Sequence, residues 1–130
     1  MNDDTMTVAR LAAFAQAWND HDIDTLMTFM SDDCEFHAVA GPGLLGSSFI
    51  GLDAVRRGFP LAWQTFPDAS WTDADYFVSG HRGIAECTFK GTRADGMRVE
   101  ARMVDIFTFR GAKIVVKNAF RKDRPLARVE

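Results

Sequence analysis

The amino-terminal half of the chain places apolar residues at helical spacing. From Val8 to Trp18 they recur every three or four positions, which predicts an amphipathic helix. A polar turn at 19–22 separates this helix from a second, shorter one over 23–30. A third helix is expected over 51–66, and Pro60 should kink it or split it into two turns, because proline lacks an N–H and clashes with the preceding turn. Three helices are therefore predicted before residue 70, where the helical spacing of apolar residues ends.

From residue 70 the apolar positions alternate instead, which predicts strands. Their connections are short and rich in turn residues, so neighbouring strands are expected to be antiparallel. An earlier short strand over 34–39 precedes a glycine-rich loop at 40–50 that is long enough to border a cleft. Helices followed by a curled sheet indicate an α+β fold. The four later strands are expected at 71–78, 82–90, 97–109 and 113–121.

The composition is that of one globular domain. The chain has 130 residues, of which 47% are hydrophobic and 25% charged, so we expect a single domain over 1–130 with a loose tail at 122–130. Eleven Phe and three Trp favour an aromatic-lined cavity or a large buried face. The net charge of −3 gives no reason to expect nucleic acid or an anionic membrane as partner. Without a membrane-length apolar stretch or a leader pattern, a cytoplasmic location is the default expectation.

One predicted strand face carries a single carboxylate. Every second residue from Val99 to Phe109 is apolar except Asp105. Burying this acid ionised and unpaired would cost several kcal/mol, so it must find a donor or become neutral. Neutral acids occur in active sites that need a hydrogen-bond donor, whereas a structural aspartate would be satisfied by a backbone N–H, an arginine or a water. Asp105 is the leading catalytic candidate.

His37 and Glu86 are the other two candidates for proton transfer. An imidazole titrates near neutral pH, which suits a general base. Strict alternation from Phe36 turns His37 to the opposite face, unless a bulge near the glycine-rich loop resets the direction. Glu86 would be a second acid in the pocket if its face of the strand looks inward, as we favour, and otherwise a surface or dimer-interface charge.

Three segments follow one family pattern in order. They are WNDHDID at 18–24, SDDCEFH at 31–37 and DIFTFRGAKIV at 105–115. On these segments the chain resembles the nuclear transport factor 2-like superfamily, and within it the SnoaL-like and ketosteroid-isomerase-like branch. The resemblance implies a cone-shaped, curved antiparallel sheet wrapped around three N-terminal helices, as in the cystatin-like α+β barrel. It also implies a deep apolar pocket and a homodimer formed through the convex face of the sheet.

The catalytic residues of that branch are matched only in part. The isomerase pattern has a tyrosine on the first helix and a base aspartate early in the first strand, where this chain has Phe14 and Ala38, with His37 beside the latter. Its third member, a protonated aspartate that donates to the oxyanion, corresponds to Asp105. The aspartate of the SnoaL-like cyclase pattern falls near Ala119. The resemblance therefore supplies one catalytic residue and leaves the base open.

The last strand has two possible inward faces. Hydrophobicity favours the face with Ile114 and Phe120, whereas the register of the resembled family places Lys117 and Arg121 on the pocket, which we favour. These two cations could pair with Asp105 or Glu86 and keep the acids ionised, or they could hold an anionic ligand.

These observations predict a small-molecule enzyme of the isomerase or cyclase type, without metal or organic cofactor, that transfers protons on an apolar carbonyl or polyketide-like compound. One alternative is a non-catalytic binding protein for a hydrophobic metabolite, and another is a stress- or partner-associated dimer with an incidental pocket. The predicted pocket residues are Phe14, Trp18, Phe59, Trp63, Met103, Phe107, Lys117 and Arg121.

Overall fold

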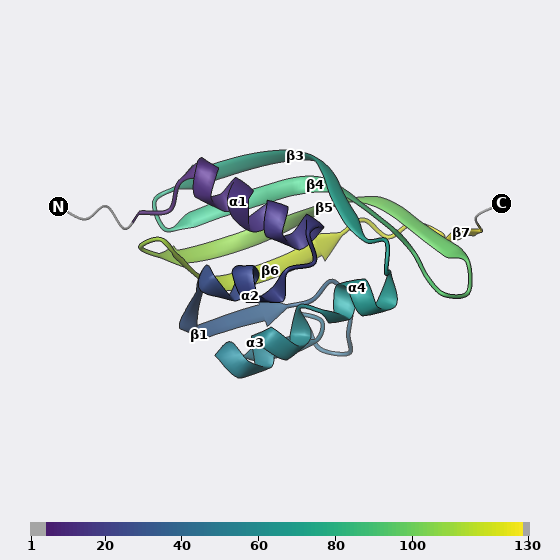
Figure 1. Ribbon diagram of the computed structural model, residues 1–130, viewed down its shortest axis with the longest axis horizontal. Helices are drawn as coiled ribbons and strands as arrows, with labels where there is room; N and C mark the ends of the chain where they lie inside the picture. Colours follow the sequence, from purple (N-terminus) through teal and green to yellow (C-terminus); the bar gives the residue numbers. More distant parts are fainter. Residues whose placement is uncertain (1–4, 129–130) are drawn as a thin grey trace.

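The computed structural model describes residues 5–128, in which short helices lie against one strongly curved sheet (Figure 1). The predicted α+β class is confirmed. The first helix begins at Val8 because the Thr7 side chain accepts a hydrogen bond of 3.0 Å from Arg10 N. Asp22 caps the second helix in the same way, through Thr25 N. The helices in this part of the chain are α1 (Val8–Asn19), α2 (Ile23–Thr28), α3 (Leu52–Gly58) and α4 (Leu61–Thr65).

Pro60 splits the predicted third helix, as its missing N–H requires. The helix α3 ends at Gly58, and Pro60 then occupies the N-cap position of α4 with a φ of −65°. At the start of a helix the absent N–H has no intrahelical partner to lose, so proline is tolerated there. None of the helices within residues 5–128 is long and apolar enough to cross a membrane.

The sheet is mixed rather than wholly antiparallel. Its order is β2-β1-β6-β5-β4-β3, and β1 runs parallel to β6, which corrects the expectation of an antiparallel sheet. The two strands are joined through the rest of the chain and not by a hairpin, so no tight turn forces them to be antiparallel. The strands are β1 (Met30–His37), β2 (Ser48–Ile50), β3 (Ser70–Ser79), β4 (Arg82–Thr92), β5 (Met97–Arg110), β6 (Lys113–Arg121) and β7 (Ala127–Arg128).

Three boundaries differ from the sequence-based expectation. The strand β1 starts at Met30, so it includes residues assigned to the second helix and the turn after it. The strand β2 lies in the expected loop and pairs with β1. In the expected tail, β7 pairs with Met97 and Arg98 of β5, while residues 129–130 lie outside the described part. Each of these three boundaries depends on backbone pairing with a neighbouring strand. A local sequence pattern contains no information about such pairing.

A β-bulge in β6 lets residues from both of its alternating sets face inward. Between Thr108 and Phe109 of β5, the paired strand β6 advances by two residues, which leaves Val115 as the extra residue. The bulge shifts the alternation so that Ile114 and Lys117 are both buried. The hydrophobic pattern therefore identified Ile114 as an inward residue, and the register of the resembled family identified Lys117.

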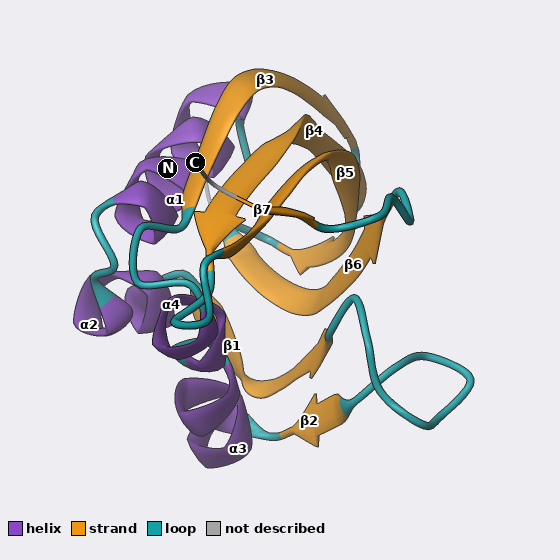
Figure 2. Ribbon diagram, turned by 90° about the vertical axis from the view of Figure 1, so that its right-hand side faces the viewer, coloured by secondary structure: helices purple, strands orange, loops and turns teal. Residues whose placement is uncertain are grey.

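The core lies between the concave face of the sheet and the helices, which cover one side of the curled strands (Figure 2). The largest fully buried side chains come from both layers, and they include Leu11, Phe14, Leu26, Val55, Phe59, Phe107 and Ile114.

Candidate functional site

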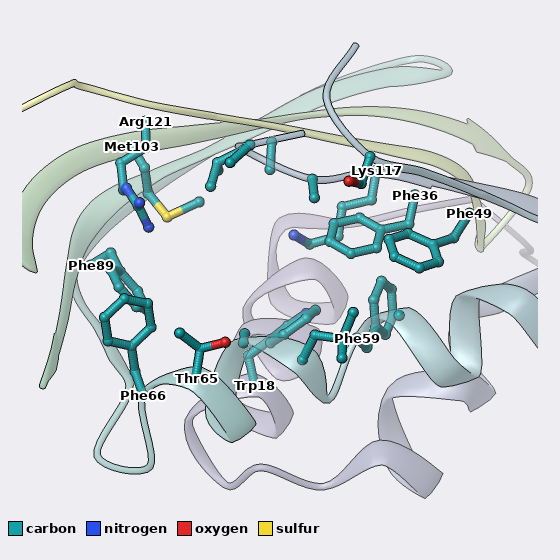
Figure 3. Close-up of a pocket in the computed structure, with 18 of the residues that line it drawn as sticks. Trp18, Phe36, Phe49, Phe59, Thr65, Phe66, Phe89, Met103, Lys117 and Arg121 are labelled. Carbon is teal, nitrogen blue, oxygen red and sulfur yellow. The ribbon is translucent and has the colours of Figure 1, made fainter. Parts of the chain in front are cut away.

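A cavity of about 340 Å³ opens between the inner face of the sheet and the helices (Figure 3). Its volume is in the range of small-molecule sites. Among the described residues that line it, Lys117 and Arg121 are the only charged ones. The rest of the wall is mainly apolar, and its aromatic side chains are Trp18, Phe36, Phe49, Phe59, Phe66, Trp71 and Phe89.

Lys117 and Asp105 form a buried ion pair at the inner end of this cavity. Lys117 Nζ lies 3.1 Å from Asp105 Oδ1, and the two residues are 5% and 9% exposed. Burial raises the pKa of Asp105, while the charge and hydrogen bond of Lys117 act in the opposite direction. The second oxygen, Oδ2, has no hydrogen-bond partner within residues 5–128. The pair therefore has one unengaged carboxylate oxygen.

Aromatic rings hold the Lys117 ammonium from the side of the cavity. Its Nζ lies 4.7 Å from the ring centroid of Trp18 and 5.0 Å from that of Phe36. Ring faces attract a cation, by about 0.5–2 kcal/mol each depending on solvent exposure. The ammonium is thus fixed between Asp105 and the ring faces, and it presents its remaining N–H groups near the cavity.

Asp105 itself borders a second, smaller cavity of about 30 Å³, which has room for a single water. Lys117 and Trp18 line both cavities, so they form the boundary between them. Cys87 also lines the smaller one, and burial raises the pKa of its thiol to about 11. The carboxylate therefore lies behind the lysine as seen from the main cavity.

The structure separates the predicted binding residues into three groups. Phe14 and Phe107 line the smaller cavity. Trp63 lines neither cavity, because its ring stacks on that of His21 with a centroid distance of 5.0 Å. The main cavity is lined by Trp18, Phe59, Met103, Lys117 and Arg121.

His37 lies outside the cavity. The alternation of β1 continues through its end, so Phe36 faces the cavity and His37 the opposite side. Its Nδ1 lies 2.7 Å from Ser48 Oγ, and its Nε2 lies 3.1 Å from Glu35 Oε1. The bulge that could have turned this side chain inward does not occur between residues 35 and 37, where pairing with β2 is regular.

Glu86 also faces away from the cavity, which corrects our preference for its inward orientation. Its carboxylate is about half exposed and pairs with Arg102 at 3.0 Å on the neighbouring strand. Ala85 and Cys87, on either side of it, are buried. The more apolar set of β4 packs against the core, as the hydrophobic effect favours.

Several cavity residues were not among those predicted. Phe89 shares the buried frame of Cys87 and could have been found from the alternation in β4. Phe36 alternates with His37 and could have been found in the same way. Phe49 lies on β2 within the expected loop, where no periodic signal pointed to a wall residue.

Solved structures with the same fold support this architecture. A protein of unknown function with a cystatin-like fold from Xanthomonas campestris is 21% identical, with a TM-score of 0.78 over 92% of each chain. A putative polyketide cyclase from Xanthomonas campestris pv. campestris is 18% identical, with a TM-score of 0.76 over 88% of each chain. A Catenulispora acidiphila protein with a ketosteroid isomerase-like fold, in complex with trimethylamine, is 16% identical, with a TM-score of 0.76 over 88% of this chain and 86% of that one.

At these identities the structural likeness establishes the fold alone. No curated protein sequence matches the chain. The family model described as a SnoaL-like domain matches residues 11–117, which include most of the helical residues, most of the cavity lining and the Lys117–Asp105 pair, but not Arg121. The predicted resemblance is thereby confirmed, and the chain belongs to the SnoaL-like domain family of the nuclear transport factor 2-like superfamily.

Proposed function

We propose that this protein is a cytoplasmic, cofactor-independent enzyme of the isomerase or cyclase type, which transfers a proton on an apolar carbonyl compound. The observation that carries the proposal is the buried Lys117–Asp105 pair at the end of an aromatic cavity. A base and a cation side by side in a site of low dielectric constant are suited to forming an enolate. The aromatic walls suit a planar or ring-bearing substrate.

In this mechanism Lys117 binds the substrate carbonyl and Asp105 accepts the proton. The ammonium donates a hydrogen bond to the carbonyl oxygen and stabilises the negative charge that develops there. Because Asp105 lies behind Lys117, the proton of the adjacent carbon passes through a water in the smaller cavity to Asp105 Oδ2, which has no other partner within residues 5–128. Burial raises the pKa of this carboxyl, which makes it a stronger base than an exposed aspartate. Return of the proton to another carbon completes an isomerisation.

The experiment uses 2-tetralone, a bicyclic ketone with exchangeable protons next to its carbonyl. Exchange of these protons in D₂O is followed by NMR with the wild-type protein and variants. We expect the wild type to accelerate exchange, and we expect Asp105→Asn or Lys117→Met to lower the enzymatic rate by roughly 10²–10⁴-fold, the usual range for a positioned base. The His37→Gln variant should retain the wild-type rate, because His37 lies outside the cavity.

A second function has support from one cavity residue. Ala38, at the position of the isomerase base, lines the main cavity and has no titratable group. A binding protein without turnover needs no general base, so alanine at this position is compatible with such a protein. If the protein only binds, 2-tetralone should shift the NMR signals of the protein, while the protons of 2-tetralone should exchange only at the background rate. That result would overturn the enzymatic proposal.

We also propose a homodimer formed through the convex face of the sheet. Large apolar side chains are exposed there, with Phe77 61% and Phe120 47% exposed. Phe77 belongs to β3 and Phe120 to β6, so the two lie on separate strands of this face, and pairing two copies across it would bury both. Sedimentation velocity at micromolar concentrations would detect the dimer.

A further inference from the structure

The main cavity is positively charged although the whole chain carries a net charge of −3. Lys117 and Arg121 line it, and no Asp or Glu is found among the described residues of its wall. Asp105 offsets Lys117 from the smaller cavity behind. Within the lining, the charge of Arg121 remains without an opposite charge.

Within the described part of the chain, Arg121 has an aromatic neighbour but no anionic partner. Its guanidinium carbon lies 5.2 Å from the ring centroid of Phe89, so the group lies over an aromatic face. Within residues 5–128 it forms neither an ion pair nor a hydrogen bond. Burial lowers the pKa of Arg121, which the charge of Asp123 opposes only in part. A half-buried guanidinium without a partner is costly, and an anion with two oxygens would satisfy its donors.

The spacing of the two cations restricts the size of the ligand. Lys117 and Arg121 are four residues apart on one face of β6, which places their Cα atoms roughly 13 Å apart at about 3.3 Å per residue. Their side chains lie toward opposite ends of the cavity (Figure 3). A ligand that reaches both would therefore be elongated, and the aromatic walls favour a flat one.

A further donor lies in the same wall. The indole N–H of Trp18 is buried and has no hydrogen-bond partner in the described structure. Trp18 lines the main cavity beside Lys117. A buried donor left unpaired costs about 1–3 kcal/mol, but this N–H has almost no exposed surface, so the preference for an acceptor-rich ligand rests on Lys117 and Arg121.

We propose that the ligand of this cavity is a flat, aromatic or polycyclic organic anion, whose carboxylate or equivalent acidic group binds Arg121. The inference deepens the proposed function by naming the substrate class of the same site. It does not depend on turnover, because it concerns binding at the opposite end of the cavity from the Lys117–Asp105 pair.

The test compares 2-naphthoate with 2-naphthamide, which has nearly the same shape and no charge, by isothermal titration calorimetry. The wild type is expected to bind the acid at least tenfold more tightly than the amide. In Arg121→Met this preference should fall below threefold while the affinity for the amide is retained. The matched control is Lys122→Met, which removes an exposed positive charge next in the chain and should keep the preference.

Four outcomes would overturn the inference. They are equal binding of acid and amide, or no binding of either, by the wild type; a preference that persists in Arg121→Met; and an equal loss of preference in Lys122→Met, which would indicate general surface charge. If Arg121→Met does not fold, Arg121→Gln replaces it under the same criteria. Exchange of the neutral 2-tetralone tests turnover separately, so either proposal can fail while the other stands.

Discussion

Lys117 and Asp105 are diagonal neighbours on adjacent strands. Asp105 is directly opposite Ala119, and Lys117 is directly opposite Phe107, so the two charged side chains meet across the strand pair at 3.1 Å. Both residues are buried, which makes each the main source of charge compensation for the other.

Lys117→Met should destabilise the fold by about 3–5 kcal/mol, because it leaves the buried Asp105 carboxylate without a counter-charge. Urea unfolding followed by tryptophan fluorescence measures the loss. The double variant Lys117→Met/Asp105→Leu should recover most of it, since neither charge remains. A single variant as stable as the wild type would contradict the pair's role.

The effect of Lys117→Met should depend on pH. Burial raises the pKa of Asp105 above its usual value of 3.8, and loss of the lysine raises it further. A folded-state pKa above the unfolded one means that the protonated acid is tolerated at low pH and that stability falls as the pH rises through the folded value. The gap between variant and wild type should therefore be small near pH 4 and grow toward pH 8. Unfolding curves at several pH values would show a constant gap if Asp105 were exposed.

Cys87 should be unreactive in the folded protein. Burial raises the pKa of its thiol to about 11, and only the thiolate reacts with disulfide reagents. Cys34 is also buried, and burial raises the pKa of its thiol as well. At pH 8 we expect no rapid reaction with Ellman's reagent, whereas both thiols should react in guanidinium chloride. Rapid titration of one thiol in the native state would show that its surroundings are open.

Gly91→Ala should destabilise the protein by about 1–3 kcal/mol through overcrowding. A Cβ at this position of β4 would lie 2.7 Å from Cβ of Phe66, a residue that lines the cavity. The Cβ atom of Phe66 cannot move unless the backbone of that residue moves. Thermal unfolding measures the change. Adding Phe66→Ala would not remove the clash, because the Cβ atom remains, but Phe66→Gly should relieve it. A neutral Gly91→Ala would indicate that the segment carrying Phe66 shifts freely.

Phe120→Glu should convert the proposed dimer to a monomer. The residue lies on the convex face and is 47% exposed, so in a dimer it would be buried against the second copy. A buried charge without a partner costs several kcal/mol at such an interface. Sedimentation velocity compares this variant with Leu44→Glu, whose side chain is fully exposed in the loop before β2 and should leave the mass unchanged. A wild-type monomer would remove the dimer proposal.

Helical spacing and turn residues were enough to predict most of the elements. The Thr7 and Asp22 caps, and the split at Pro60, depend on interactions within a few residues. The short turns that join β3 to β4, β4 to β5 and β5 to β6 are also local features, and they require these neighbouring strands to be antiparallel. Parallel pairing of β1 with β6 joins residues far apart in the chain, so a local pattern could not predict it.

The sequence by itself determined the fold class and an acid buried among apolar side chains, because these follow from local periodicity and hydrophobicity, and its resemblance to known sequence patterns indicated the family. Only the tertiary structure decided which groups meet that acid. The bulge at Val115 turns Lys117 inward to Asp105, whereas regular pairing leaves His37 and Glu86 on the other face. A shift of one residue in strand register reverses every side chain beyond it, so the composition of the site depends on pairing between distant strands.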